Sequence, residues 1–414
     1  MPRVLFDATR LFVRGSRFSP TGIDRVVLAY ARWLLARPDV GLEPVVTAGG
    51  RIWRAPRALL ASLVEGAEAF RAAARAMDDP SPAWPALAAA LDRTPGAAPP
   101  LRARSLAGQL PLRAAWHAAA FARGLWRLRR AAPAPGSIYL NVSHTGLGDP
   151  GALAGAARGG DRPVLMLHDL IPITHPEYCA PSARSRHERR MQGVLAHAAL
   201  VVANSQATAA DLAAYAARRG SPCPPVVVAP LGVEADFISP PAPLATAHPY
   251  FVCVGTLEAR KNLAFLLALW RRLAERLGER APRLVLVGRR GWENEALLDQ
   301  LHRADAAARL VSEVSDLTDR ELARLIGGAA ALLAPSLAEG YDLPVAEALS
   351  LGAPVIASDI AVHRELAAGA RLVDPLDGPG WLAAIEAPPT RPTPRRGPSW
   401  ADHFGLVGER LLAP

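Results

Sequence analysis

The sequence predicts an α/β protein in which two doubly wound parallel sheets face each other across a cleft. Three observations predict this fold class. At 414 residues the chain is too long for one ordinary hydrophobic core. Short Val/Ile/Leu runs alternate with longer amphipathic segments, which is typical of parallel strands joined by crossover helices. Four prolines interrupt this pattern at Ser239–Pro249, and they indicate an interdomain linker.

The alternation gives the predicted elements of each half. In the first half we expect helices at Asp24–Ala36, Arg184–His197 and Gln206–Arg218, and strands at Val4–Phe6, Pro44–Thr47, Ile138–Val142, Val164–Leu167, Leu200–Ala203 and Val226–Ala229. In the second half we expect strands at Phe251–Val254, Leu284–Val287, Ala330–Leu333, Val355–Ala357 and Arg371–Val373. The predicted organisation is a first domain at 1–238, the linker at 239–249, a second domain at 250–390, and a tail with a last helix at 391–414.

Residues 57–135 depart from the alternation. They are rich in Ala, Arg and Pro without a convincing strand, and they predict a helical insertion in the first domain. Two interpretations stay open: a membrane-surface element at the inner face of the cell membrane, or a helical cap with solvated arginines. Nucleic acid is not expected, because no nucleic-acid-binding module accompanies the charge. The basic and aromatic residues concerned are Arg102, Arg104, Arg113, Trp116, Phe121, Arg123, Trp126, Arg127, Arg129 and Arg130.

Charge and cysteine usage limit the function classes. The net charge of +9 favours anionic partners such as nucleotide diphosphates. The three cysteines, Cys179, Cys223 and Cys253, form no CxxC pair, so they predict buried thiols in a reducing compartment. The N-terminus lacks a signal-peptide layout and no stretch approaches the length of a membrane span, so we expect a cytoplasmic protein.

The first chemical motif follows the strand Ala330–Leu333 and runs from Ser336 through Glu339 to Glu347. Pro344 suits the first turn of a helix, which makes Gly340–Leu343 a strand-to-helix loop at the carboxyl edge of the sheet. Backbone N–H groups of such a loop can meet an anion, and Glu347 can accept hydrogen bonds from a diol.

The second motif, Gly255–Asn262, directly follows the first strand of the second domain. It contains Lys261, the single lysine among 47 basic residues. Beside Arg260 at a helix start, this ammonium group could neutralise a diphosphate leaving group. The alternative is a solvated pair of cations with Asn262 capping the helix.

The segment EGYDLPVAEA resembles the E-x7-E motif of family 4 retaining glycosyltransferases, which have the two-Rossmann-domain GT-B fold. The resemblance implies that Glu347 holds the donor ribose and that Glu339 contacts the donor sugar. It implies that Tyr341, Asp342 and Leu343 lie at the nucleotide. The family usually has glycine where this chain has Asp342, and Asp tolerates unusual φ values better than most residues.

The same resemblance extends to the basic pair and to the first domain. It places Arg260 and Lys261 on the donor diphosphate; many members have arginine where this chain has Thr256. His168, at the end of a first-domain strand, matches a position that lines the reaction centre, although a lone histidine is more often structural.

Four glycine-containing or strand-end positions complete the resemblance. Gly22, in the loop after the first strand, matches the family's N-terminal glycine loop. Gly288 would abut the nucleotide. Asn204-Ser205 and Pro230–Val233 are interpreted as mainly architectural.

The resemblance therefore implies retaining transfer of a hexose, with mannose or rhamnose favoured, to a polysaccharide or lipid-linked glycan. The donor would be GDP-mannose, with UDP- or dTDP-sugars as alternatives. We expect no further cofactor and no metal, because Arg260 and Lys261 would do what a metal does elsewhere. The alternatives are a GT-B hydrolase or phosphorylase and a non-catalytic scaffold. Hydrolases need carboxyls roughly 5 to 9.5 Å apart, whereas eight helical residues span about 12 Å.

Overall fold

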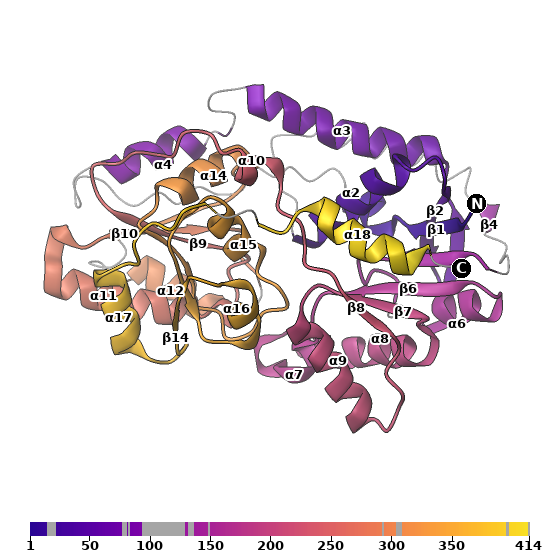
Figure 1. Ribbon diagram of the computed structural model, residues 1–414. Coiled ribbons are helices and arrows are strands. Elements are labelled where there is room, and N and C mark those ends of the chain that lie inside the picture. Colours follow the sequence, from indigo (N-terminus) through magenta and orange to yellow (C-terminus); the bar gives the residue numbers. More distant parts are fainter. Residues whose placement is uncertain are drawn as a thin grey trace.

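Two lobes, each built on one sheet, lie side by side in the computed structural model (Figure 1). The structure describes residues 1–14, 22–76, 81, 83–92, 129–130, 136–147, 150–291, 294–303, 309–394 and 397–412. The second sheet is parallel throughout, the first is parallel except at one edge, and helices cover the faces of both. The predicted fold class is confirmed.

The first sheet has eight strands in the order β4-β3-β2-β1-β5-β6-β7-β8. Its central strands are buried, which explains why they read as continuous apolar runs in the sequence. The predicted strands of this half are all present, with small differences at their ends. The bounds are β1 Arg3–Asp7, β2 Gly41–Ala48, β3 Arg51–Arg54, β4 Arg129–Arg130, β5 Ile138–Asn141, β6 Arg162–Leu167, β7 Leu200–Ala203 and β8 Val226–Val228.

The antiparallel edge of this sheet was not predicted. Strand β3 pairs antiparallel with β2, and β4 pairs antiparallel with β3. Strand β4 lies inside the 57–135 segment, for which the sequence predicted only helix. The prediction was wrong there because a two-residue edge strand leaves no detectable periodicity.

The second sheet has six parallel strands in the order β11-β10-β9-β12-β13-β14. Strand β11 was missed because its sequence, Val-Ser-Glu-Val, lacks the apolar run of its neighbours. The other strands match the prediction to within a residue. The bounds are β9 Tyr250–Val254, β10 Arg283–Val287, β11 Val311–Val314, β12 Ala331–Ala334, β13 Val355–Ser358 and β14 Arg371–Val373.

Amphipathic helices pack against both sheets, and the three helices predicted in the first half are observed as α2, α8 and α9. In the first half the helices are α1 Thr9–Arg14, α2 Gly22–Leu35, α3 Arg57–Ala76, α4 Ala83–Asp92, α6 Pro150–Arg158, α7 Ile171–Thr174, η1 Pro176–Tyr178, α8 Ala183–His197, α9 Gln206–Arg218 and α10 Ala235–Ile238. In the second half they are η2 Ala259–Lys261, α11 Leu263–Leu277, η3 Gly278–Arg280, α12 Glu295–Arg303, α14 Asp319–Gly328, α15 Leu343–Ser350, α16 Ala361–Leu366, α17 Gly378–Glu386 and α18 Trp400–Leu411.

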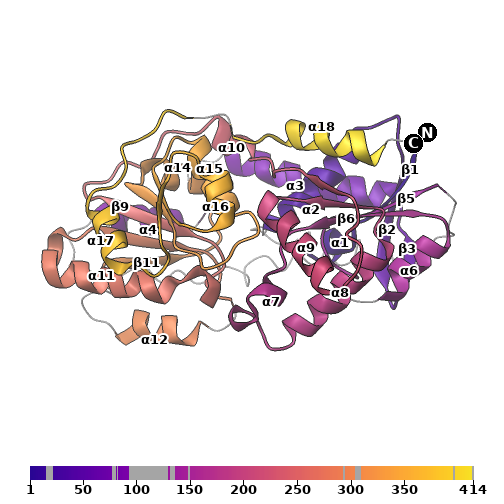
Figure 2. The same cartoon turned by 60° about the horizontal axis from the view of Figure 1, so that its bottom comes forward.

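Helix α4 corrects the assignment of the whole insertion to the first domain. Helix α3 packs against α2 of the first domain, but α4 packs against β11 of the second (Figures 1 and 2). The Trp84 ring is 2% exposed and lies 4.8 Å from the Arg324 guanidinium carbon. The Asp92 carboxylate accepts a hydrogen bond from the Ala247 N–H at 3.1 Å. The physical reason for this correction is that the apolar face of α4, which includes Trp84, is buried against the second domain and not against the first. The predicted membrane-surface residues 102–127 lie outside the described residues.

The last helix, α18, crosses back to the first domain. The Phe404 ring stacks on Trp33 of α2 at 4.7 Å, and the Tyr30 hydroxyl hydrogen-bonds the His403 Nε2 at 2.8 Å. Where the chain crosses, the backbone of Trp400 passes against Gly232, leaving no room there for a side chain. Of the helices described, none combines the length and apolar character needed to cross a membrane.

Candidate functional site

The two predicted motifs of the second domain meet because β9 and β12 are neighbours in the sheet, so the loops after them share one edge. The Glu339 carboxylate lies 2.6 Å from both the Lys261 Nζ and the Arg260 Nη1. The Lys261 Nζ also lies 3.3 Å from the Asp342 carboxylate. The Ser336 hydroxyl donates to Glu339 at 2.9 Å. The structure thus joins four of the predicted residues into one network of ion pairs.

Lys261 reaches this network by passing over Gly255. That glycine has φ 147°, and a Cβ built there would lie 2.7 Å from the Lys261 Cε. The residue after strand β9 therefore has to be glycine for the lysine to lie where it does. Lys261 is only 6% exposed, so the alternative of a solvated pair is wrong. Asn262 does not cap α11 with its side chain, which donates to the Pro375 carbonyl at 3.0 Å instead.

The charges of this network are fixed by mutual attraction. Burial lowers the pKa of Lys261, but Asp342 and Glu339 outweigh burial and hold it above its usual value. Burial likewise raises the pKa of Glu339, yet Arg260 and Lys261 hold it below its ordinary range. The pKa of Asp342 is depressed in the same way by Lys261 and His363 against burial. Arg260, Lys261, Glu339 and Asp342 are therefore all ionised at neutral pH.

Asp342 takes the left-handed conformation, with φ 69° and ψ 68°, directly before α15, and Pro344 lies in the first turn as predicted. Its carboxylate accepts from the His363 Nε2 at 3.0 Å, and the His363 Nδ1 lies 2.9 Å from the Ser358 carbonyl. Because both acceptors lack a proton, both ring nitrogens must donate, which describes an imidazolium. Burial lowers the pKa of His363, but Asp342 outweighs burial and raises it. A third cation thus supports the loop.

Glu347 lies on α15, in the second domain, and its carboxylate bonds a residue of the first domain. The Arg25 guanidinium, from the first turn of α2, pairs with Glu347 through Nη1 and with Asp319 through Nη2. Glu347 is 2% exposed. Burial raises its pKa to about 7; nearby Asp319 and Glu234 add to this rise, and Arg25 opposes it.

The first-domain edge presses directly on the Glu339–Glu347 loop. A Cβ at Gly340 would run into the His168 carbonyl. The Gly340 carbonyl accepts from the Ser205 hydroxyl at 2.7 Å and from Thr208 at 3.2 Å. The Asn204 amide donates to the His168 carbonyl at 2.9 Å. Ser205, interpreted as architectural, thereby joins the two domains, and Asn204 holds the His168 carbonyl against which Gly340 packs.

His168 is buried, and its ring Nε2 lies 2.8 Å from the Val142 carbonyl. Since a carbonyl only accepts, Nε2 carries the proton, and Nδ1 is the acceptor nitrogen of the neutral ring. Burial lowers the pKa of His168, with the bond to Val142 opposing. The ring is therefore neutral at pH 7 and can accept a hydrogen bond from a hydroxyl.

Three other predicted residues take different places. Gly22 packs directly against Leu343, since a Cβ on it would sit 3.3 Å from the Leu343 Cδ1. Gly288 fits tightly against the Gly255 carbonyl at the ends of β10 and β9, where a side chain has no room. Tyr341 points away, and its hydroxyl donates to the Leu231 carbonyl at 3.0 Å, in the first domain between β8 and α10. Only the backbone of Tyr341 is thus left to face a ligand.

The sequence reasoning missed Arg25, Asp319 and His363. A signal existed for Arg25, because a cation in the first turn of a helix faces the positive end of the helix dipole and needs an acidic partner. No comparable signal marks His363, which lies in the short helix α16.

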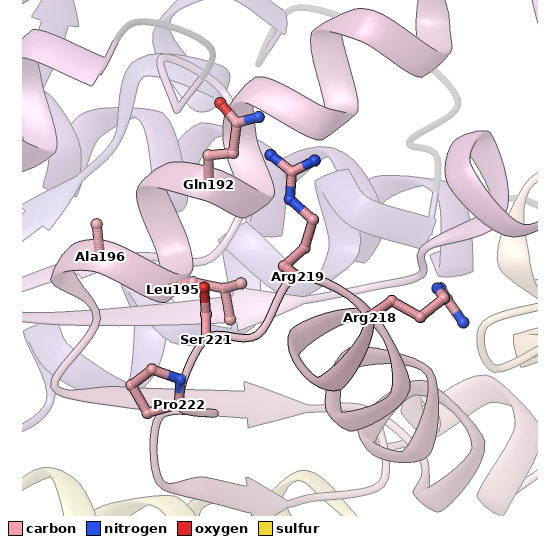
Figure 3. A pocket seen from close by; sticks show the side chains of 7 residues that line it. All are labelled: Gln192, Leu195, Ala196, Arg218, Arg219, Ser221 and Pro222. Atoms are coloured by element: carbon pink, nitrogen blue, oxygen red, sulfur yellow. The ribbon is translucent and has the colours of Figure 1, made fainter.

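A separate pocket lies on the first domain (Figure 3), lined by Gln192, Leu195, Ala196, Arg218, Arg219, Ser221 and Pro222. It sits at the C-terminal end of α9, whereas the contact with Gly340 is at the N-terminal end of that helix. Thirteen helical residues, about 20 Å, separate the two ends. This pocket is therefore distinct from the network around Lys261.

Two Rossmann-like sheets that meet at their carboxyl edges, with buried cations at the edge of the second, define the GT-B class of fold. Residues 248–387 match the family described as glycosyl transferases group 1. The match lies within the C-terminal domain of the chain. Over the whole chain, the structure is similar to that of Anabaena Alr3699/HepE in complex with UDP. The TM-score is 0.55 at 15% identity, and the match covers 99% of this chain and 95% of the other.

Curated relatives match over about half of this chain. The O-antigen chain mannosyltransferase B of Escherichia coli is 30% identical over 228 residues, which are 52% of this chain and 58% of the relative. The serotype-specific mannosyltransferase WbdA of Escherichia coli is 28% identical over 49% of this chain and 26% of the relative. The chain thus spans less than two thirds of the length of either relative.

Proposed function

We propose that this protein is a retaining glycosyltransferase that moves a hexose from a nucleotide-diphosphate sugar to a polysaccharide or lipid-linked glycan. The observation that carries the proposal is the Arg260–Lys261 pair, of which Lys261 is buried and Arg260 half-buried, held by Glu339 at the edge of the second sheet that meets the first domain. An anion brought to this edge meets two fixed cations in surroundings that are largely shielded from water. Electrostatic interactions are much stronger there than in bulk water.

Arg260 and Lys261 would bind the donor diphosphate and stabilise it as it departs. Their carboxylate partners hold both side chains in place before the phosphates arrive, so little reorganisation accompanies the reaction. Removing one such preorganised charge typically lowers the rate by about a hundredfold to a thousandfold. The positive His363 would add to this field through Asp342.

The sugar would lie between Glu339 and His168. Glu339 is ionised and can accept hydrogen bonds from sugar hydroxyls, and the neutral His168 ring can accept one at Nδ1. Neither group is assigned as a general base: Glu339 is already paired with two cations, and His168 has a lowered pKa. Catalysis then depends on the leaving group and on a closed cleft.

Glu347 would accept the ribose hydroxyls, and the backbone of Tyr341, Asp342 and Leu343 would lie against the phosphates at the start of α15. Gly22, across from Leu343, would let the first domain approach the donor closely. Gly288, at the end of β10, would face the nucleotide with its backbone, because the Gly255 carbonyl fills the place of a side chain.

Mannose or rhamnose is the favoured sugar, and GDP-mannose the favoured donor, with UDP- and dTDP-sugars as alternatives. The support is that both curated relatives described above carry the name mannosyltransferase. The acceptor domain would be the first, since its carboxyl edge, at His168, faces the donor loop.

We propose that transfer needs no metal, because the two cations take the place of one. Among the described residues, no three His, Cys, Asp or Glu side chains are grouped so as to hold a metal ion. The prediction is that chelation with EDTA leaves the rate of transfer unchanged.

The test is a donor panel read by intact product mass, with the anomeric configuration of the product read by NMR. GDP-mannose, UDP-glucose and dTDP-rhamnose are each incubated with the protein and a set of tagged α-mannosides and lipid-linked oligosaccharides. We expect one donor to add one hexose with retained anomeric configuration, and Lys261→Met to abolish the addition. Inversion at the anomeric carbon would contradict the retaining mechanism. Thermal unfolding is measured alongside with GDP, UDP and dTDP. If none of the three raises the melting temperature and no donor gives a product, the proposed transferase activity is refuted.

A further inference from the structure

One ion-pair bridge joins α2 of the first domain to two helices of the second. Arg25 pairs with Asp319 at the start of α14 and with Glu347 in α15. The three side chains are 12%, 14% and 2% exposed. The guanidinium carbon also lies 6.0 Å from the centre of the Phe237 ring. This bridge is largely shielded from water, so it is not an ordinary surface salt bridge.

The bond from Arg25 engages one oxygen of Glu347, Oε1. Within the described residues, no group hydrogen-bonds the second oxygen, Oε2. A carboxylate has lone pairs for several donors, so Oε2 can accept from a hydroxyl while Oε1 remains with Arg25. One carboxylate can thus serve the first domain and a ligand at the same time.

We propose that Arg25 is a positioning residue for nucleotide recognition: it fixes and charges Glu347, so that the second domain binds a ribose diol fully only when the first domain is docked. The inference rests on the proposed function, which places the ribose on Glu347. Arg25 itself contacts the protein carboxylates and not the ribose.

The charges around Glu347 explain why it needs a cation from the other domain. The groups that face it are Arg25 on α2, Asp319 on α14 and Glu234 just before α10. Burial disfavours the carboxylate most, and two of these three groups are acids, which is why the pKa of Glu347 is raised to about 7. Arg25 is the group that opposes this rise. Without it, Glu347 would be protonated over more of the neutral range and would lose charge-assisted bonds to a diol.

The experiment is a thermodynamic cycle in which a change of the Arg25 side chain is combined with removal of the ribose hydroxyls from the ligand. The affinities of GDP and 2′,3′-dideoxy-GDP are measured by calorimetry for the wild type, Arg25→Met and Arg25→Lys. UDP and its dideoxy form replace them if UDP binds more tightly. The matched control is Glu365→Gln, because the Glu365 carboxylate accepts from the Gln206 N–H across the same domain interface, at 2.9 Å, without touching Glu347.

We expect Arg25→Met to weaken GDP about tenfold to a hundredfold, the range for one hydrogen bond to a charged group, and to leave dideoxy-GDP nearly unchanged. Arg25→Lys should restore part of the loss. Glu365→Gln should affect both nucleotides equally. The ratio of the GDP affinity to the dideoxy-GDP affinity is also measured as a function of pH. The midpoint of its rise should move to higher pH in Arg25→Met, since the pKa of Glu347 rises.

Equal losses for GDP and dideoxy-GDP in Arg25→Met would overturn the inference, because Arg25 would then act only on domain docking. An unchanged GDP affinity would overturn it as well. If neither GDP nor UDP binds the wild type, the proposed function itself fails, which separates the two results.

Discussion

The buried carboxyl of Glu347 gives the sharpest prediction about stability. Its pKa is raised by burial from 4.5 to about 7, so the folded protein holds this proton more tightly than the unfolded chain does. The stabilisation from this group is therefore greatest at acidic pH and falls as the pH rises from 4.5 to 7. A rise of about 2.5 pKa units corresponds to about 3 kcal/mol in total, of which about 2.5 kcal/mol falls between pH 5 and pH 8.

The perturbation is Glu347→Gln, which keeps the shape and an oxygen acceptor for Arg25 but does not titrate. Urea unfolding of both proteins at pH 5 and pH 8, followed by tryptophan fluorescence, gives the free energies. The wild type should lose about 2.5 kcal/mol more than Glu347→Gln between the two pH values. Asp319→Asn, which removes an acid that raises the pKa of Glu347, should give an intermediate loss. Identical pH dependence in wild type and Glu347→Gln would refute the reasoning.

Three further predictions concern other contacts. Gly340→Ala puts a methyl group against the His168 carbonyl, so it should separate the domains. We expect a larger radius of gyration in X-ray scattering and slower transfer, and unchanged values would contradict the contact. His363→Phe should lower the free energy of unfolding more at pH 6 than at pH 9. The pKa of His363 is raised, so its bond to Asp342 stabilises the fold at low pH and weakens as the pH rises. Equal losses at the two pH values in urea unfolding would contradict this. Trp84→Ala should destabilise the protein by about 3–5 kcal/mol in urea unfolding, and a neutral result would mean that α4 is not anchored on the second domain.

The sequence predicted the parts of the fold that depend on local pattern. Strands such as β6 and β9 are buried on both faces, so they leave continuous apolar runs that mark them. The meeting of Lys261 with Glu339 also followed from local information, because each lies in a loop at the carboxyl end of a strand, and parallel strands bring those ends to one edge.

What the sequence could not predict depends on contacts across the domain interface. Arg25 and Glu347 are 322 residues apart, and no periodicity relates them. The apolar residues of α4 do not show in the sequence which domain buries them. The left-handed conformation of Asp342 is stabilised by Lys261 and His363, whose nearness is a result of the fold. Short edge strands such as β4 were not predicted because two residues are too few to show a periodic pattern.

The central claim is that Arg260 and Lys261 bind the donor diphosphate, and the affinity of GDP compared with guanosine tests it most directly. If UDP is the tighter ligand, UDP and uridine are used instead. Arg260→Met and Lys261→Met should each weaken the nucleotide at least about tenfold, and the double variant by about a hundredfold or more. The affinity of these variants for the nucleoside should stay unchanged. The control variant Arg271→Met, at an exposed site, should bind the nucleotide as tightly as the wild type. A double variant that binds the nucleotide as tightly as the wild type would contradict the account.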